Sequence, residues 1–198
     1  DRGRCRGVMR IGIYGYTDKR PVIYALLKLL QTTGDVALLT NNRHYTRLLE
    51  SGERLGHFAN VLIAVTDATP DEVFEEIGYA PEDFDHVLFD VQDTIPSDLH
   101  LAIHVKAYAP SEDEQALLGM LNEPVTVKMA YDGRREKNAI HVMPNSRLWQ
   151  AAERIEHFRL LEPLPSKVMN AEFAKLLAPH LNIKPKQALG ILTRRRSK

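Results

Sequence analysis

The chain has 198 residues, of which 44% are hydrophobic and 26% charged, and its 26 Lys and Arg balance its 26 Asp and Glu. This composition is typical of a globular protein of about one domain; it excludes a disordered chain, and no apolar run approaches the about 20 residues of a membrane-spanning helix. Cys5 is the single cysteine, which excludes an internal disulfide framework and favours a cytoplasmic setting.

Residues 1–8 contain four charged side chains, two glycines and no hydrophobic periodicity, so we interpret them as a leader, a tag remnant or an upstream extension. After them the pattern predicts a strand over residues 10–14, a turn over 15–18, a helix over 20–31 and a buried strand over 36–40. Pro21 suits the first helical turn, where its missing N–H leaves no bond unmade. This order of elements is typical of a parallel β–α–β unit.

The same alternation continues through the middle of the chain. Thr69 with Glu72 and Ser111 with Glu114 form two capping boxes that predict helix starts. A short helix is expected over residues 42–50, a loop over 51–60, and strands over 61–66, 86–90, 101–108 and 125–129. Apolar strands separated by helices predict an α/β fold with a doubly wound, mainly parallel sheet that is flanked by helices.

Helices dominate the C-terminal part of the chain. They are expected over residues 148–158, 167–177 and 185–193, with a proline-marked break at 162–166. The last two helices form a pair that either packs on the sheet or stands apart as an interaction module. We therefore divide the chain into an α/β domain over residues 9–165 and C-terminal helices with a basic tail over 166–198.

The turn after the first strand is where such folds bind phosphate, because the N–H groups at a helix start point there. A phosphate-binding loop has the pattern G-x-x-x-x-G-K-[ST], whereas residues 15–22 read Gly-Tyr-Thr-Asp-Lys-Arg-Pro-Val, without the second glycine or the lysine–hydroxyl pair. The candidate nucleotide-binding residues are Gly15, Thr17, Lys19 and Arg20, with Asp90 and Asp93 at the end of a later strand as candidate Mg²⁺ ligands. A plain strand–helix turn and a polar strand end are the alternatives, since Asp18 opposes phosphate and Pro21 lacks a donor.

Other catalytic or metal-binding patterns are sparse. His100 and His104 lie four residues apart on an expected strand, about 13 Å from each other, which is too far for shared zinc coordination. The sequence contains no G-x-S-x-G nucleophile elbow. We therefore expect no catalytic residue and no resident metal.

Four segments together resemble parts of a known family. Residues 9–15 read Met-Arg-Ile-Gly-Ile-Tyr-Gly, residues 84–90 Phe-Asp-His-Val-Leu-Phe-Asp, residues 108–111 Tyr-Ala-Pro-Ser and residues 140–145 Ile-His-Val-Met-Pro-Asn. In that order they resemble the opening strand, the Walker B strand, the strand end before a late helix and the base-proximal segment of the ParA/MinD group of P-loop ATPases, the deviant Walker class. The resemblance covers roughly residues 9–180 and implies a P-loop NTPase-like fold.

The chain departs from this family at positions of the family's nucleotide-binding motifs. The loop does not hold both of the family's lysines, Thr40 and Asn41 stand where the second strand usually ends in Asp, and residues 128–131 lack the asparagine usually found near the base. The resemblance therefore implies the fold without the ATPase activity.

The sequence favours one function and leaves two alternatives open. The first expectation is a non-catalytic ParA/MinD-like scaffold or regulatory subunit that acts by protein–protein contact in a larger bacterial or phage assembly, without a cofactor. One alternative is a nucleotide-dependent switch ATPase that uses ATP and Mg²⁺ through an unorthodox loop. The other is a DNA-binding accessory or partition protein that uses the basic tail.

The balanced net charge hides an uneven distribution along the chain. Residues 1–20 hold six basic and two acidic side chains, residues 67–98 hold eleven acidic ones and no Lys or Arg, and the last fifteen residues hold six basic ones and no acid. The basic tail residues are Lys184, Lys186, Arg194, Arg195, Arg196 and Lys198. They form either a nucleic-acid contact or a solvated helix end, and the acidic middle faces a basic partner, the tail of a neighbouring copy, or solvent.

Overall fold

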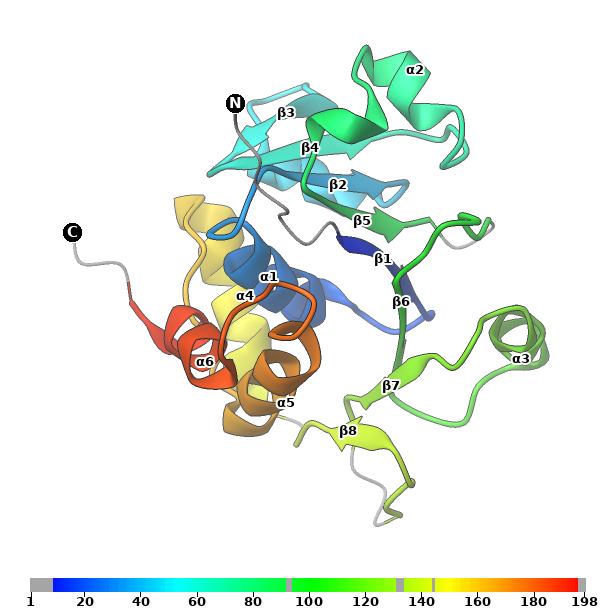
Figure 1. Cartoon of the computed structure of the whole chain (residues 1–198), viewed down its shortest axis with the longest axis vertical. Helices are drawn as coiled ribbons and strands as arrows, with labels where there is room; N and C mark the ends of the chain where they lie inside the picture. The colour runs from blue at the N-terminus through cyan, green and yellow to red at the C-terminus, as the bar shows by residue number, and fades with distance from the viewer. Residues whose placement is uncertain (1–8, 92–93, 131–133, 144, 196–198) are drawn as a thin grey trace.

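The computed structural model describes residues 9–91, 94–130, 134–143 and 145–195. These residues build one eight-stranded sheet in the order β3-β4-β2-β5-β1-β6-β7-β8 (Figure 1). The strands are β1 (Met9–Tyr14), β2 (Val36–Thr40), β3 (Leu55–Phe58), β4 (Val61–Val65), β5 (His86–Asp90), β6 (Leu101–Lys106), β7 (Val125–Lys128) and β8 (Ala139–His141). Neighbouring strands are parallel except for β3 and β4, which pair antiparallel. The expected α/β fold with a mainly parallel sheet is confirmed.

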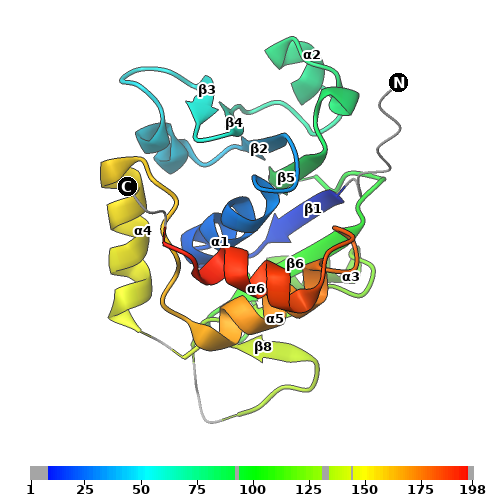
Figure 2. The same ribbon diagram turned by 60° about the vertical axis from the view of Figure 1, so that its left-hand side comes forward.

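Helices cover the two faces of the sheet unequally. The α-helices are α1 (Arg20–Leu30), α2 (Val73–Ile77), α3 (Glu112–Gly119), α4 (Ser146–Phe158), α5 (Lys167–Leu177) and α6 (Pro185–Thr193), and two 3₁₀ turns are η1 (Arg43–Leu48) and η2 (Pro81–Asp83). We call the face covered by α1, α4, α5 and α6 the front face, and the face covered by α2, α3 and the β5–β6 connection the back face (Figures 1 and 2). The largest apolar cluster fills the front side of the sheet, and two smaller clusters lie behind it.

Helix α1 is the centre of the front layer. Every residue from Pro21 to Leu30 is buried, because the sheet lies on one side of the helix while α4 and α6 pack on the other. A helix that is apolar all round is stable only when it is enclosed in this way. The start of α1 is therefore held rigidly at the carboxyl end of β1, which is where a ligand site was expected.

The C-terminal helices belong to this same core. Met169, Phe173 and Leu177 of α5 are buried in one cluster with Ala188 and Leu192 of α6 and with residues of β1 and α1. Of the two arrangements that the sequence left open, the pair thus packs on the rest of the fold.

Two strands at the edges of the sheet were not predicted. The loop expected over residues 51–60 is wrong for Leu55–Phe58, which form β3 and pair with β4. In β3 only Phe58 is buried, and a segment that also contains Gly56 and His57 has no alternating apolar pattern. The short strand β8 has the same weakness, with three residues and one buried side chain. Both strands form by pairing with a neighbouring strand, and a local sequence pattern does not reveal that pairing.

Candidate functional site

The carboxyl edge of the sheet around β1 is the place where this fold can build a site. The chain leaves β1 toward α1 on the front face, whereas it leaves β5 toward β6 over the back face. Where neighbouring strands of an open parallel sheet send their connections to opposite faces, a crevice forms at their carboxyl ends. Lys19 at the start of α1 and Asp90 at the end of β5 both lie at this edge.

Lys19 and Asp90 form a buried ion pair. Lys19 Nζ lies 2.6 Å from Asp90 Oδ1, and the two side chains are 6% and 1% exposed. Thr40, which faces Asp90 in the register of β2 and β5, donates its hydroxyl to Asp90 Oδ2 at 2.7 Å. Burial raises the pKa of Asp90, and Lys19 and Thr40 act in the opposite direction. The cation expected for phosphate and the carboxylate expected for Mg²⁺ therefore neutralise each other.

The helix start itself is already occupied by a carboxylate. Asp18 Oδ1 accepts a hydrogen bond from the backbone N–H of Arg20 at 3.0 Å, and Pro21 has no N–H to offer. A bound anion would need these same donors. Asp18 thus stands where a phosphate oxygen would bind.

Arg20 is held by three carboxylates. Its guanidinium lies 2.8 Å from Asp18, 3.0 Å from Glu156 and 3.1 Å from Glu153. Burial opposes its charge, but the hydrogen bonds to Asp18 and Glu156 outweigh burial and raise the pKa of Arg20 above its ordinary value. Arg20 is therefore a structural cation at this edge, already saturated with acidic partners.

Glu156 joins three elements at the same edge and was not singled out by sequence reasoning. Its carboxylate accepts from Arg20 and from the Tyr24 hydroxyl at 2.9 Å, and it lies 2.8 Å from His44 Nε2 in η1. Burial and the neighbouring Glu156 carboxylate raise the pKa of Tyr24. The sequence held one signal: Glu156 lies four residues after Ala152, on the buried side of an amphipathic helix.

The other candidate loop residues have different surroundings. Gly15 is buried with φ +130°, and a Cβ there would clash with the Val105 carbonyl oxygen, so the chain requires glycine at this point. Thr17 is half-buried and lines a small cavity with Tyr16 and Tyr108. Asp93 lies outside the described residues.

The four described residues of the basic tail do not form one compact patch. Lys184 and Lys186 are exposed at the start of α6, and Arg194 and Arg195 are exposed at its end. A helix of nine residues separates the two pairs by about 13 Å. Arg196 and Lys198 lie outside the described residues.

Two further clusters of ionisable side chains lie on the β6 side of the sheet. His104 and Glu114 form a buried pair at 2.6 Å between β6 and α3. Lys106 lies 2.7 Å from Glu136, and its hydrogen bond keeps the pKa of Glu136 below its usual range. Within the described ranges, no group of three His, Cys, Asp or Glu side chains is placed to hold a metal ion, and no helix is long and apolar enough to cross a membrane.

The fold and this edge define the class of protein: an α/β protein with a mainly parallel sheet, whose β1–α1 turn is closed by internal ion pairs. Comparison with known proteins adds no family to this description, since no family model, curated protein or solved structure matches the chain.

Proposed function

We propose that the chain is a non-catalytic, ParA/MinD-like scaffold or regulatory subunit that acts by protein–protein contact in a larger cytoplasmic assembly. One observation carries the proposal: the buried Lys19–Asp90 ion pair, in which the cation and the carboxylate that a nucleotide and its Mg²⁺ would need are already bound to each other. Asp18 at the start of α1 supports it, because its carboxylate already accepts from the backbone there.

A bound phosphate would compete with Asp90 for Lys19. A nucleotide phosphate that binds without Mg²⁺ would have to draw Lys19 away from Asp90 and leave the buried carboxylate without its cation, which costs about 3–5 kcal/mol. Since about 1.4 kcal/mol is tenfold in affinity, this cost weakens phosphate binding by about two to three and a half orders of magnitude. A bound Mg²⁺ would have to displace Lys19 in the same way.

Isothermal titration with ATP, ADP and GTP in the presence of Mg²⁺ tests the proposal. We expect no measurable heat of binding from the wild-type chain or from Glu153→Gln, a control at an exposed partner of Arg20. Micromolar nucleotide binding with hydrolysis would contradict the proposal that the chain is a non-catalytic scaffold.

A nucleotide-dependent switch is the second candidate, because Lys19 and Asp90 do lie together at the carboxyl edge of the sheet. It predicts that the wild-type chain dimerises when ATP and Mg²⁺ are added and that Lys19→Ala or Asp90→Ala abolishes the response. Sedimentation velocity with and without nucleotide distinguishes the candidates, since a scaffold gives the same profile in both conditions.

Nucleic-acid binding is the third candidate, and it is favoured by the exposed basic residues at both ends of α6. It predicts duplex-DNA affinity that falls steeply as salt rises. Fluorescence anisotropy with labelled DNA measures this, and Lys186→Glu with Arg194→Glu should weaken binding to every sequence alike. A DNA affinity that does not change with salt concentration would exclude this function for α6.

A further inference from the structure

Helix α3 is attached to the back of the sheet at few points. Of its eight residues only Glu114 and Leu117 are buried, whereas every residue of α1 from Pro21 to Leu30 is buried. Figure 1 shows α3 apart from the other helices, on the side of β6 and β7. A helix of this length is not stable by itself in water, because it makes too few hydrogen bonds to offset the cost of starting it. Its stability therefore depends on what holds it to the sheet.

Two side chains of α3 reach the sheet, one apolar and one ionisable. Leu117 packs in a small cluster with Tyr14 and Ala102. Glu114 Oε1 lies 2.6 Å from His104 Nε2, and the two side chains are 10% and 3% exposed. Because His104 belongs to β6, this buried pair ties the first turn of α3 to the strand. Breaking such a pair leaves a buried group without its partner, so the pair holds α3 in place.

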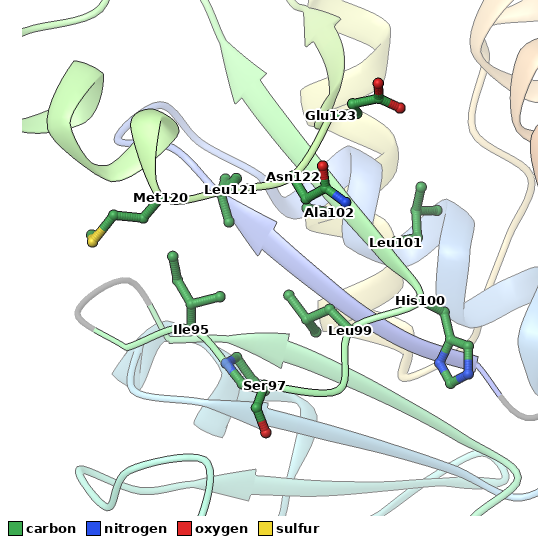
Figure 3. A pocket seen from close by; sticks show the side chains of 11 residues that line it. Ile95, Ser97, Leu99, His100, Leu101, Ala102, Met120, Leu121, Asn122 and Glu123 are labelled. Carbon is green, nitrogen blue, oxygen red and sulfur yellow. The ribbon is translucent and has the colours of Figure 1, made fainter.

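A cavity borders each end of α3. At its start, a cavity of about 250 Å³ is lined by Glu114 and by the exposed Tyr108, which precedes the helix. At its end, a cavity of about 750 Å³ is lined by Met120 and Leu121 on one side and by the β5–β6 connection on the other (Figure 3). Atoms that line a cavity lack contacts on that side. Helix α3 is therefore supported at its middle and not at its ends.

The residue that α3 helps to cover has an unsatisfied polar atom. Tyr14 is fully buried in the cluster that contains Leu117, and its hydroxyl has no hydrogen-bond partner among the described residues. A buried hydroxyl without a partner is unfavourable, and water that enters when α3 moves away satisfies it. The closed arrangement is thus less favourable than a fully satisfied one.

We propose that residues 109–123 form a movable cover, with α3 at its centre, which detaches from the back face while the rest of the fold stays intact. The His104–Glu114 pair and Leu117 hold this cover closed. In the open form α3 is unfolded, the two cavities join, and the back of β1 and β6 around Tyr14 faces solvent. The movement is a property of the fold and does not depend on the proposed scaffold function.

Native-state hydrogen exchange of the full chain, followed by mass spectrometry, tests the cover. The amides of residues 115–121 should exchange at least about a hundredfold faster than those of residues 23–30 in α1, because local opening is easier than global unfolding. Urea below the unfolding transition should barely change the exchange of α3 and should accelerate that of α1, since only global unfolding exposes much surface. Exchange of α3 at the rate and with the urea dependence of α1 overturns the inference.

Glu114→Gln distinguishes a cover held by the His104–Glu114 pair from a helix that only frays. It should speed the exchange of α3 about tenfold, because His104 loses its buried carboxylate partner. Glu112→Gln is the matched control, since it removes the same charge from the same helical turn at an exposed position, and it should change the rate by less than about threefold. Leu117→Ala is a second variant that should also speed exchange. Equal effects of Glu114→Gln and Glu112→Gln would overturn the inference as well.

Discussion

The sequence indicated Lys19 and Asp90 as candidate ligand-binding residues. In the structure their side chains bind each other. A buried charge without a partner is costly, and at 2.6 Å the two side chains remove that cost for each other. The pair gives Lys19 a structural role at the end of the β1–α1 turn.

Replacing Lys19 with Met should destabilise the fold by about 3–5 kcal/mol at neutral pH, because Asp90 is left buried and unpaired. Burial already holds the pKa of Asp90 above its ordinary value, and loss of Lys19 raises it further. An acid whose pKa is higher in the folded than in the unfolded state takes up a proton on folding, so the variant should lose stability as pH rises above about 4.

Urea unfolding at several pH values measures both effects. The double variant Lys19→Met, Asp90→Asn should be more stable at pH 7 than Lys19→Met alone, because it removes the unpaired charge. Equal stability of Lys19→Met and the wild-type chain at pH 7 would show that the pair is not coupled.

A second prediction at this scale concerns the stability effect of the buried Tyr14 hydroxyl. Its side chain is buried, its hydroxyl has no hydrogen-bond partner among the described residues, and burial raises its pKa to about 12. Tyr14→Phe should therefore be neutral or should stabilise the fold by about 1 kcal/mol. Between the unfolded pKa of about 10 and the folded value, the wild-type chain should lose stability relative to the variant.

Tyr24→Phe is the matched comparison, since the Tyr24 hydroxyl donates to Glu156 at 2.9 Å. Loss of a bond to a carboxylate should cost about 1.5–3 kcal/mol in urea unfolding. A Tyr14→Phe chain that is less stable than Tyr24→Phe would show that the Tyr14 hydroxyl has a stabilising partner.

At the scale of elements, the β1–α1 turn depends on backbone geometry that only glycine supplies. Gly15 has φ +130°, and a Cβ there would meet the Val105 carbonyl. Gly15→Ala should cost about 2–4 kcal/mol. Gly119→Ala, at the end of α3 with open space around it, should instead stabilise the chain by about 0.5–1 kcal/mol. Thermal unfolding of both variants checks the contrast, and a harmless Gly15→Ala would show that the turn can relax.

Helix α4 is tied to α1 and η1 through Glu156, and its neighbour Glu153 provides a control on the same helix. Both carboxylates contact Arg20, but Glu156 is 4% exposed and Glu153 is 59% exposed. Glu156→Gln should cost about 2–3 kcal/mol because the partly buried Arg20 loses a carboxylate partner and the buried Tyr24 hydroxyl loses a charged acceptor. Glu153→Gln should cost less than about 1 kcal/mol. Similar losses in denaturant unfolding would mean that Glu156 does not organise this edge.

At the scale of the whole molecule, the C-terminal helices complete a core that begins at β1. A chain ending at residue 165 would uncover the outer side of α1 and lose the buried side chains of α5 and α6. We expect it to lose cooperative thermal unfolding by circular dichroism, whereas a chain ending at Arg195 should melt as the full chain does. Cooperative unfolding of the shorter chain would make residues 166–198 a separate module.

Local sequence patterns were sufficient to predict many of the helices and strands. Helices over 167–177 and 185–193 were predicted with the bounds that the structure gives them, because amphipathic spacing, serine capping and a proline at the helix start act within a few residues. The Ser111 cap of α3 was likewise predicted and accepts from Glu114 N–H. The departure of residues 15–22 from the phosphate-loop pattern and the uneven charge were visible for the same reason.

Tertiary structure decided which of these residues meet. The strand order places β5 beside β1, and only that neighbour relation brings Asp90 to Lys19. The packing of α4 against α1 brings Glu156 to Arg20, and pairing with β4 turns a segment expected as a loop into β3. The crossovers also place the acidic helices α2 and α3 on the back face and the basic ends of α6 on the front face. Residue patterns therefore determined the elements and their charges, whereas contacts between residues far apart in the chain, which depend on strand order and crossover side, determined the partner of each charge.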